Sequence, residues 1–394
     1  MTSKLEELIA ELCPNGVEYK TIQEVCVNIC SGGTPKTSIS EYYGGDIPWV
    51  RTQEVDWNYI YDTDVKITEE GLANSSAKWI SANCIIVAMY GATAAKVAIN
   101  KIPVTTNQAC CNLEINENIV LIRYVYHFLC NEYENLKGMG QGSQSNINAQ
   151  MIKNYKLPVP PLEAQREIVR ILDNFTELTA ELTAELTARK KQYEYYRDTL
   201  LTFDDNNPLH SFISRYCPNG VEYKKIGEIA NYEQPTKYIV KSTEYNNSFA
   251  TPVLTAGQSF ILGYTDELDN IYLASKDNPV IIFDDFTGAI QWVDFPFKVK
   301  SSAMKMITAK PNVLIRYLYH WMALLGFSSS EHKRLWISTY SNFEIPVPPL
   351  EVQAEIVRIL DTFTELTAEL TAELTARRKQ YEYYRDQLLT FKRA

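Results

Sequence analysis

The chain has 394 residues, of which 45% are apolar, so it is long enough to bury at least two cores of ordinary size. Its formal net charge of −10 excludes a simple basic nucleic-acid binder, because phosphate neutralisation supplies most non-specific affinity. A local nucleic-acid surface, shared with a partner, remains compatible with this charge.

The N-terminal segment MTSKLEELIAELCPNG places glutamates among its apolar residues, and no later run approaches 18 apolar residues. We therefore expect a soluble, cytoplasmic protein with no signal peptide and no membrane segment. The eight cysteines and four histidines show no zinc spacing, so we expect free thiols and no metal. His127 and His320 occupy matching places in LIRYVYHF and LIRYLYHW, which favours a scaffold role for both.

The most informative feature is a long internal repeat. The 46 residues from Pro158 to Phe203 return from Pro346 to Phe391 with only five substitutions. The octapeptide CPNGVEYK also occurs twice, starting at Cys13 and again 204 residues later. A repeat of this length indicates two similar halves.

Each long repeat is predicted to be a helix, because its apolar residues alternate spacings of three and four after an initial proline cluster. The helices are expected over Leu162 to Phe203 and Leu350 to Phe391, each about 60 Å long at 1.5 Å per residue. Such helices need a packing partner, and each can serve the other in an antiparallel pair. The tetrapeptide TAEL recurs in both helices; one extra unit would lengthen a helix by about 6 Å and rotate the residues beyond it by roughly 40°. The TAEL repeats then either set the length of the helix or are simply a sequence that forms helix well.

Two segments remain, Tyr19 to Leu157 and Tyr223 to Ile345. Both mix short β-rich runs, such as Cys84 to Ala88 and Pro279 to Phe283, with turn residues and the helical LIRY stretch. A weak similarity between residues 85–99 and 281–295 suggests the same strand, turn and strand in each. The predicted fold class is α/β, with two α/β domains separated by two long antiparallel helices in an internal pseudo-twofold repeat. The expected boundaries are 1–157 for the first domain, 158–203 for the central helix, 204–345 for the second domain and 346–394 for the C-terminal helix.

Catalytic motifs are not found. The sequence has no GxxxxGK[ST] loop, no GxGxxG after a strand, no HExxH, no GxSxG and no Asn/Asp-Pro-Pro-aromatic motif. Asp284 and Asp285 are the best candidates for acid chemistry, but they have no basic partner at motif spacing. We expect no catalytic residues.

The two α/β segments are instead rich in polar loops, including Ser31 to Ser38, Gly138 to Asn146 and Asn231 to Tyr238. Gln and Asn can pair two ways with adenine and Arg with guanine, while Ser and Thr suit phosphates or base edges. Any soluble protein carries polar loops, so each loop alone is equally compatible with an ordinary surface.

The loop GGTP followed by YYGGDIPWVRTQEV, the segment TTNQ, the stretch GSQSNINAQMIKNYKLPVPPLEAQREIVRILD and RKKQYEYYRDTLL together resemble the specificity subunit of Type I restriction-modification systems. The resemblance spans essentially the whole chain. It implies two target-recognition domains, each reading one half of an asymmetric, interrupted DNA target, with helices that set the gap. The second domain departs from the usual pattern, with YEQPTKY and SSAMKM in place of GGTP, IPW and NQ, which suggests another recognition subtype.

The resemblance also implies partners and cofactors. The chain would be a non-catalytic subunit that binds double-stranded DNA, two methyltransferase (modification) subunits and restriction (translocase/nuclease) subunits. S-adenosylmethionine would then sit on the methyltransferase, and ATP and Mg on the restriction subunit, with no cofactor in this chain. Two other hypotheses are a coiled-coil scaffold with two protein- or ligand-binding end domains, and a self-contained modification enzyme.

Side-chain chemistry and loop position then select candidate DNA contacts. For the first half-site these are Thr34, Lys36, Arg51, Tyr90, Gln108, Gln141, Ser143 and Gln144. For the second half-site they are Gln234, Lys237, Thr255, Thr287, Lys305, Arg334, Trp336 and Ser338.

Overall fold

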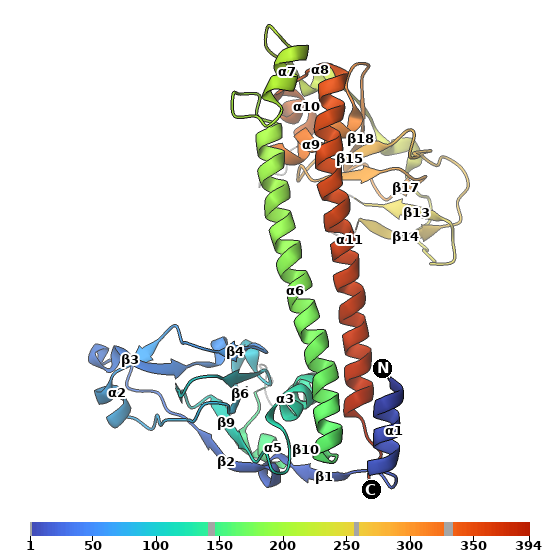
Figure 1. Ribbon diagram of the computed structural model, residues 1–394. Coiled ribbons are helices and arrows are strands. Elements are labelled where there is room, and N and C mark those ends of the chain that lie inside the picture. Colours follow the sequence, from blue (N-terminus) through green and yellow to red (C-terminus); the bar gives the residue numbers. More distant parts are fainter. Residues whose placement is uncertain (1, 141–145, 256–259, 327–333) are drawn as a thin grey trace. The chain divides into compact units, whose positions relative to one another are not determined.

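The computed structural model describes residues 2–140, 146–255, 260–326 and 334–394. The chain divides into two compact units, one formed by Met1–Thr183 with Glu373–Ala394 and the other by Ala184–Ala372. Each unit holds one α/β domain and one end of each long helix (Figure 1). Within the described ranges, no helix combines the length and the apolar character needed to span a membrane.

The α/β domain of the first unit contains a five-stranded sheet of order β2-β9-β6-β7-β4 and a three-stranded sheet of order β5-β3-β8. A further antiparallel pair, β1 and β10, brings the start of the domain to its end. The central strand β6 is fully buried, as its continuous apolar run IIVA requires. The strands are β1 (Glu18–Thr21), β2 (Cys26–Ser31), β3 (Tyr43–Val50), β4 (Tyr59–Ile60), β5 (Lys66–Ile67), β6 (Ile85–Ala88), β7 (Val97–Asn100), β8 (Thr105–Thr106), β9 (Cys110–Ile115) and β10 (Lys156–Val159). The helices are α1 (Thr2–Leu12), α2 (Glu69–Ala73), α3 (Ile122–Asn131), α4 (Tyr133–Gly138) and α5 (Ala149–Asn154), with the 3-10 turns η1 (Ile22–Val25), η2 (Ser40–Tyr42), η3 (Thr52–Glu54) and η4 (Gly91–Thr93).

The second unit repeats this plan with a four-stranded sheet of order β12-β18-β15-β16 and a three-stranded sheet of order β14-β13-β17. The pair β11 and β19 corresponds to β1 and β10. The strands are β11 (Tyr223–Lys225), β12 (Ala230–Glu233), β13 (Thr251–Leu254), β14 (Ile261–Thr265), β15 (Val280–Asp284), β16 (Ile290–Val293), β17 (Lys298–Val299), β18 (Met304–Ala309) and β19 (Glu344–Pro346). The helices are α7 (His210–Tyr216), α8 (Ile226–Ile229), α9 (Ile315–Leu325) and α10 (Leu335–Ser338), with the 3-10 turns η5 (Pro235–Tyr238) and η6 (Tyr340–Asn342).

The pairing of strands matches between the two domains. In each small sheet the middle strand pairs parallel with one neighbour, β3 with β8 and β13 with β17. In each large sheet a hairpin, β6–β7 or β15–β16, pairs antiparallel through its first strand with β9 or β18. The predicted strand, turn and strand in both halves is therefore confirmed, and so is the α/β fold class.

The two long helices are α6 (Leu162–Leu200) and α11 (Leu350–Leu389). In the first unit Phe175 of α6 stacks on Tyr384 of α11, with ring centroids 5.5 Å apart. In the second unit Tyr196 of α6 stacks on Phe363 of α11 at 5.0 Å. Early residues of one helix thus meet late residues of the other, which confirms the antiparallel pair.

The first long helix ends before the predicted Phe203, and the physical reason is a side-chain cap. Asn207 is buried and its Nδ2 donates to the carbonyls of Leu200 and Thr202, at 3.0 and 2.7 Å. These carbonyls would otherwise be unsatisfied at the helix end. The second long helix also ends short of the predicted Phe391, at Leu389.

Each α/β domain is fastened to a long helix by a buried histidine. His127 Nε2 lies 2.6 Å from Asp173 Oδ1 on α6, and His320 Nε2 lies 2.9 Å from Asp361 Oδ1 on α11. Arg123 and Arg316 bond to the same two carboxylates. Both histidines thus occupy scaffold positions, as their matching sequence contexts suggested.

Burial lowers the pKa of both His127 and His320, so the neutral imidazole is the favoured form. Desolvation alone would raise the pKa of Asp173, but the hydrogen bonds from His127 and Arg123 lower it. A neutral His127 then donates from Nε2 to a carboxylate, which leaves Nδ1 as an acceptor.

Candidate nucleic-acid interface

The loops that carry the predicted contacts of the first domain meet at one edge of its two sheets, where β2, β3, β6 and β8 end. Three backbone hydrogen bonds close this edge: Gly33 N to Thr106 O at 2.9 Å, Asn107 N to Val50 O at 3.0 Å and Met89 N to Ala109 O at 2.8 Å. The segments after the four strands are therefore neighbours in space, although they are scattered along the sequence.

Four predicted residues lie on this edge. Thr34 follows β2 and its hydroxyl donates to Oε1 of Gln108, which follows β8. Arg51 follows β3, and Tyr90 follows β6 with 44% of its surface exposed. The structure thus brings together side chains that are up to 74 positions apart, Thr34 and Gln108.

The remaining predicted residues of the first domain are less tightly placed. Lys36 is exposed in the segment after β2. Gln141, Ser143 and Gln144 lie outside the described residues. Arg51 is half-buried, with Nε 3.8 Å from Glu54 and its own N–H donating to the same carboxylate at 2.7 Å. Its guanidinium is thereby held toward η3.

The two glycines of the GGTP loop, Gly32 and Gly33, allow close packing of the backbone. A Cβ built on Gly32 would lie 1.8 Å from the carbonyl oxygen of Thr106, and one built on Gly33 would lie 2.4 Å from the N–H of Ala77. Both glycines are needed because the backbone approaches its neighbours so closely. Their lack of a side chain lets the loop sit against β8, next to Gln108.

The second domain closes its edge with equivalent hydrogen bonds. Lys300 N donates to Leu254 O at 2.9 Å, and Asp285 N donates to Ala303 O at 3.0 Å. Leu335 N donates to Asp285 O at 2.8 Å, as Ile147 N donates to Met89 O at 3.0 Å in the first domain. By this correspondence Asp285 stands where Met89 stands, and Arg334 stands where Asn146 stands.

Most predicted contacts of the second domain also lie along this edge. Gln234 and Lys237 follow β12 and are exposed, and Thr287 is exposed in the β15–β16 turn. Thr255 follows β13 and its N–H donates to the carbonyl of Phe260 at 3.0 Å. Arg334 and Ser338 are exposed at α10, where the Ser338 hydroxyl donates to the Arg334 carbonyl at 2.7 Å.

Two of the predicted contacts differ from the others, because their side chains are buried in this structure. Trp336 is 2% exposed and stacks on Tyr340, with Phe283 against its edge. Lys305 is 1% exposed, with Nζ 2.9 Å from Asp285 Oδ2. Trp336 therefore packs the core beneath α10 and cannot stack on a base, while Lys305 cannot reach a phosphate.

The acidic pair Asp284 and Asp285 has structural partners. Asp284 Oδ1 accepts the N–H groups of Phe286 and Thr287, at 2.9 and 3.2 Å, and so shapes the β15–β16 turn. Asp285 has the basic partner that its sequence neighbourhood lacks, Lys305 of β18, whose strand position pairs with Phe283. Within the described ranges, no group of three or more His, Cys, Asp and Glu side chains is arranged to hold a metal ion.

Asn146 is a residue of this edge that the sequence does not single out. Its Oδ1 accepts the N–H of Gly91 at 3.2 Å, which ties the segment before α5 to the turn after β6. It stands at the end of a polar loop in which glutamines and serines are the more obvious candidates for base contacts. Its equivalence to Arg334 becomes visible only through the hydrogen bonds.

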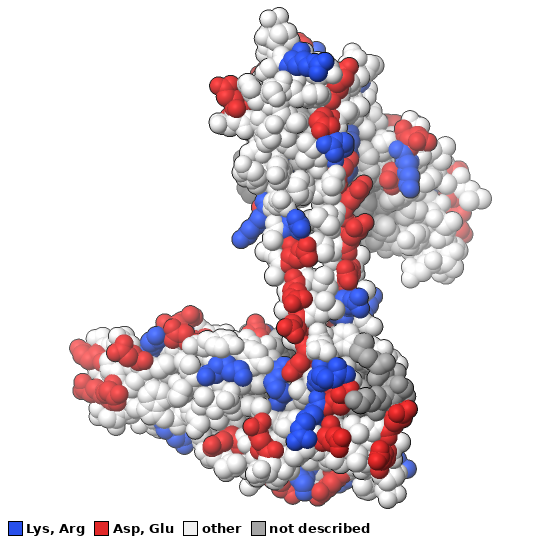
Figure 2. Space-filling view, in the orientation of Figure 1, with Lys and Arg blue, Asp and Glu red and all other residues white. Residues whose placement is uncertain are grey.

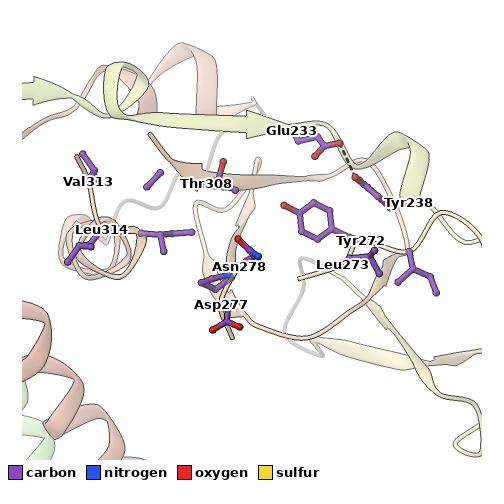
Figure 3. A pocket seen from close by; sticks show the side chains of 13 residues that line it. Glu233, Tyr238, Tyr272, Leu273, Asp277, Asn278, Thr308, Val313 and Leu314 are labelled. Atoms are coloured by element: carbon purple, nitrogen blue, oxygen red, sulfur yellow. Dashed lines mark hydrogen bonds between the residues drawn. The ribbon is translucent and has the colours of Figure 1, made fainter. Parts of the chain in front are cut away.

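A pocket of about 670 Å³ lies beside the edge of the second domain (Figure 3). Two residues that line it are linked, because the Tyr238 hydroxyl donates to Glu233 Oε1 at 3.1 Å, and Lys237 Nζ lies 2.7 Å from the same oxygen. Asn278, Thr308 and Leu314 also line the pocket. None of the predicted contacts lines this pocket, although Gln234 and Lys237 adjoin its lining residues Glu233 and Tyr238.

Negative charge is concentrated on the long helices. Figure 2 shows acidic side chains in a row along each of them. The exposed glutamates of the TAEL segments form these rows: Glu177, Glu181 and Glu185 on α6, and Glu365, Glu369 and Glu373 on α11. The net charge of −10 thus arises in part from residues away from the two sheet edges.

Two α/β domains with one strand plan but different edge residues, each mounted on a duplicated helix, define a two-domain specificity scaffold. A family model described as Type I restriction modification DNA specificity domain matches residues 14–189 and 218–377. The chain belongs to this family.

Individual relatives are also described as type I specificity subunits. The chain is 58% identical over 183 residues to the specificity subunit of the Escherichia coli type I restriction enzyme EcoR124I/EcoR124II, a match that covers 44% of this chain and 45% of that relative. The match thus spans less than half of that relative's length. A putative type I restriction enzyme specificity subunit of Haemophilus influenzae is 27% identical over 95% of this chain and 96% of its own length.

Solved structures show the same fold. The S subunit of a Type I restriction-modification system from M. genitalium superposes with a TM-score of 0.68 at 15% identity, covering 95% of this chain and 97% of that one. A chain from a structure of type I R-M complex assembly and conformational transition gives a TM-score of 0.56 at 16% identity, over 95% and 98%.

Proposed function

We propose that this chain reads a bipartite, asymmetric DNA target, with each α/β domain recognising one half-site. In this proposal residues 1–157 and 204–345 are the two target-recognition domains, and residues 158–203 and 346–394 carry the helices between them. The family is that of specificity subunits, and the division of labour within this chain follows from its two unlike sheet edges.

The observation that carries the proposal is the equivalence of these edges. Both domains expose loops after corresponding strands, held by corresponding backbone hydrogen bonds, yet the side chains differ: Tyr90 follows β6 and Thr287 lies in the turn after β15. A shared frame with different polar side chains suits direct readout, because hydrogen bonds to base edges carry the sequence information. Unlike edges make the target asymmetric.

The chain itself is proposed to be non-catalytic. This is supported by the structural contacts of the acidic pair of the second domain, in which Asp284 shapes a turn and Asp285 pairs with Lys305. Methyl transfer to a base requires extrusion of that base from the stack. This chemistry, with S-adenosylmethionine, is assigned to two methyltransferase subunits docked on the duplicated helices, and ATP-dependent cleavage to restriction subunits.

The helices are proposed to set the number of unread base pairs between the half-sites. Their TAEL segments are continuous helix, and Thr179 and Thr183 satisfy their hydroxyls within the helix, on the carbonyls four residues earlier at 2.9 and 2.6 Å. Each tetrad contributes about 6 Å of length.

The test is genome-wide mapping of methylated adenine in cells that express this chain with its methyltransferase subunit. The proposal predicts one motif of two unlike half-sites separated by a fixed gap. A folded complex that methylates without sequence preference would instead support a scaffold with end domains for proteins or small ligands. S-adenosylmethionine binding by the chain alone would revive a self-contained modification enzyme.

A further inference from the structure

The buried Asp285–Lys305 pair lies behind the edge of the second domain and contacts both sides of it. We propose that this ion pair is a positioning device for readout of the second half-site: it holds the Gln234 amide and the Arg334 segment at fixed places on the edge. The inference rests on the proposed function, because it assigns a role within DNA reading.

Asp285 organises the segment that carries Arg334. Its Oδ1 accepts the N–H of Trp336 at 2.9 Å, and its main-chain carbonyl accepts the N–H of Leu335 at 2.8 Å. Arg334 Nη1 lies 4.0 Å from Oδ2 of the same carboxylate, with 56% of the Arg334 side chain exposed. One buried carboxylate therefore fixes both the backbone after Arg334 and the near end of its guanidinium.

Lys305 completes the arrangement and orients Gln234. Its Nζ lies 2.9 Å from Asp285 Oδ2, in an orientation that makes the contact an ion pair rather than a directed hydrogen bond. The same Nζ donates to Gln234 Oε1 at 3.0 Å. An ammonium group can only donate, so the amide oxygen of Gln234 must face it. The NH₂ group of Gln234 is then turned away from Lys305 as a donor, suited to an acceptor on a base edge such as N7 or O4.

The frame of the domain does not need this ion pair, as the first domain shows. There Met89 stands in the place of Asp285, and Cys111, two residues after Ala109, stands in the place of Lys305. Met89 and Cys111 are 3% and 0% exposed and belong to the apolar core. The same strands and the same backbone hydrogen bonds thus form around an apolar pair, although burying two charges is costly. We therefore assign the two charges to the positioning of the edge residues that they contact, Gln234 and Arg334.

The test replaces the pair by the residues that the first domain uses, Asp285→Met together with Lys305→Cys, in the full chain expressed with its methyltransferase subunit. Methylated-adenine mapping of the unchanged complex comes first and must give a bipartite motif; if it does not, the proposed function fails. With that motif in hand, the double variant is expected to form a folded complex, to keep the first half-site, and to lose preference by roughly tenfold or more for at least one base pair of the second half-site.

A matched control removes a different buried ion pair from the same unit. Lys298 lies fully buried with Nζ 2.8 Å from Glu267 Oε2. In the variant Lys298→Met with Glu267→Gln, an amide oxygen remains for the N–H groups of Lys241 and Ser242 that Glu267 accepts. This variant is expected to keep both half-sites. If the Asp285/Lys305 double variant keeps its second half-site unchanged, or if it fails to fold while the control folds, the inference is overturned.

Discussion

The two α/β domains share the same strand pairing. They differ in the buried residues that lie directly behind the edge of their sheets. In the first domain these residues are apolar, Met89 and Cys111, and the edge residues hold one another, as Thr34 holds Gln108. In the second domain they form an ion pair, and Gln234 is held from behind by Lys305. One strand plan therefore supports two ways of fixing a glutamine at the same edge. The same strand frame can thus carry different residues at its edge.

Substitutions at the attachment of each domain to its long helix should cause the largest loss of stability. The loss should be the same in both halves. Buried Gln165 accepts the Leu121 N–H at 2.8 Å and donates to the carbonyls of Pro160 and Ile119; Gln353 makes the same contacts in the second unit. Gln165→Leu or Gln353→Leu leaves three backbone groups unsatisfied and should cost about 3 kcal/mol or more of unfolding free energy. Urea unfolding of the full chain measures this loss.

A control for this prediction is built into the repeat. Arg166 is exposed, and the second copy carries Ala354 at the same place. Arg166→Ala should change stability by less than about 0.5 kcal/mol. A large loss for Gln165→Leu with none for Gln353→Leu would show that the two attachments are not equivalent.

Removing a reading side chain should affect only its own half-site. Gln108→Ala should weaken discrimination at the first half-site by about 1 to 3 kcal/mol and leave the second unchanged, because Gln108 belongs to the edge of the first domain. Gln234→Ala should do the reverse. Affinity measurements of the methyltransferase complex on duplexes altered in one half-site at a time give both values. Loss at both half-sites from either change would contradict separate reading.

A smaller effect is expected from pH, and it should again be shared by both halves. The pKa of His127 and of His320 is lowered by burial, so the unfolded chain takes up protons at a higher pH than the folded chain does. Stability should therefore decline as pH falls from about 7 through the ordinary histidine range near 6.5. Asp173 and Asp361, whose pKa values are lowered by their partners, add a further loss at more acidic pH, as those carboxylates become protonated.

Thermal unfolding between about pH 7.5 and 5 measures this decline. The variant His127→Gln with His320→Gln should be less stable throughout, because each buried side chain also packs. Its stability should depend less on pH between about 7 and 5.5. An unchanged pH dependence would show that these histidines are not its source.

The helices and central strands can be predicted from the sequence more fully than the residues exposed at the sheet edges. The repeat from Pro158 predicts the paired helices, and buried runs such as IIVA predict central strands, because apolar period and length report directly on burial. The helix end at Leu200 escapes prediction, since it depends on the Asn207 side chain. The domain boundaries stay a prediction.

Individual edge residues are harder to predict, because burial of a polar side chain depends on a partner far along the chain. Lys305 is buried only because Asp285 faces it from the end of β15, and Trp336 because Phe283 and Tyr340 enclose it. In the sequence Lys305 follows the polar stretch Lys300–Ser302 and Trp336 follows Lys333 and Arg334, a context typical of an exposed binding loop. Thr34 and Gln108, in contrast, lie side by side, because both follow strands that end at the same edge.

We propose that the edge loops read the DNA sequence and that the two long helices set the distance between the half-sites. The most direct test of this proposal deletes one tetrad from each helix of the same chain, Thr179–Leu182 and Thr367–Leu370, and maps methylated adenine with the methyltransferase subunit present. The account predicts that both half-sites are retained while the gap between them becomes shorter. An unchanged gap, or an altered half-site sequence, in a folded and active complex would contradict it.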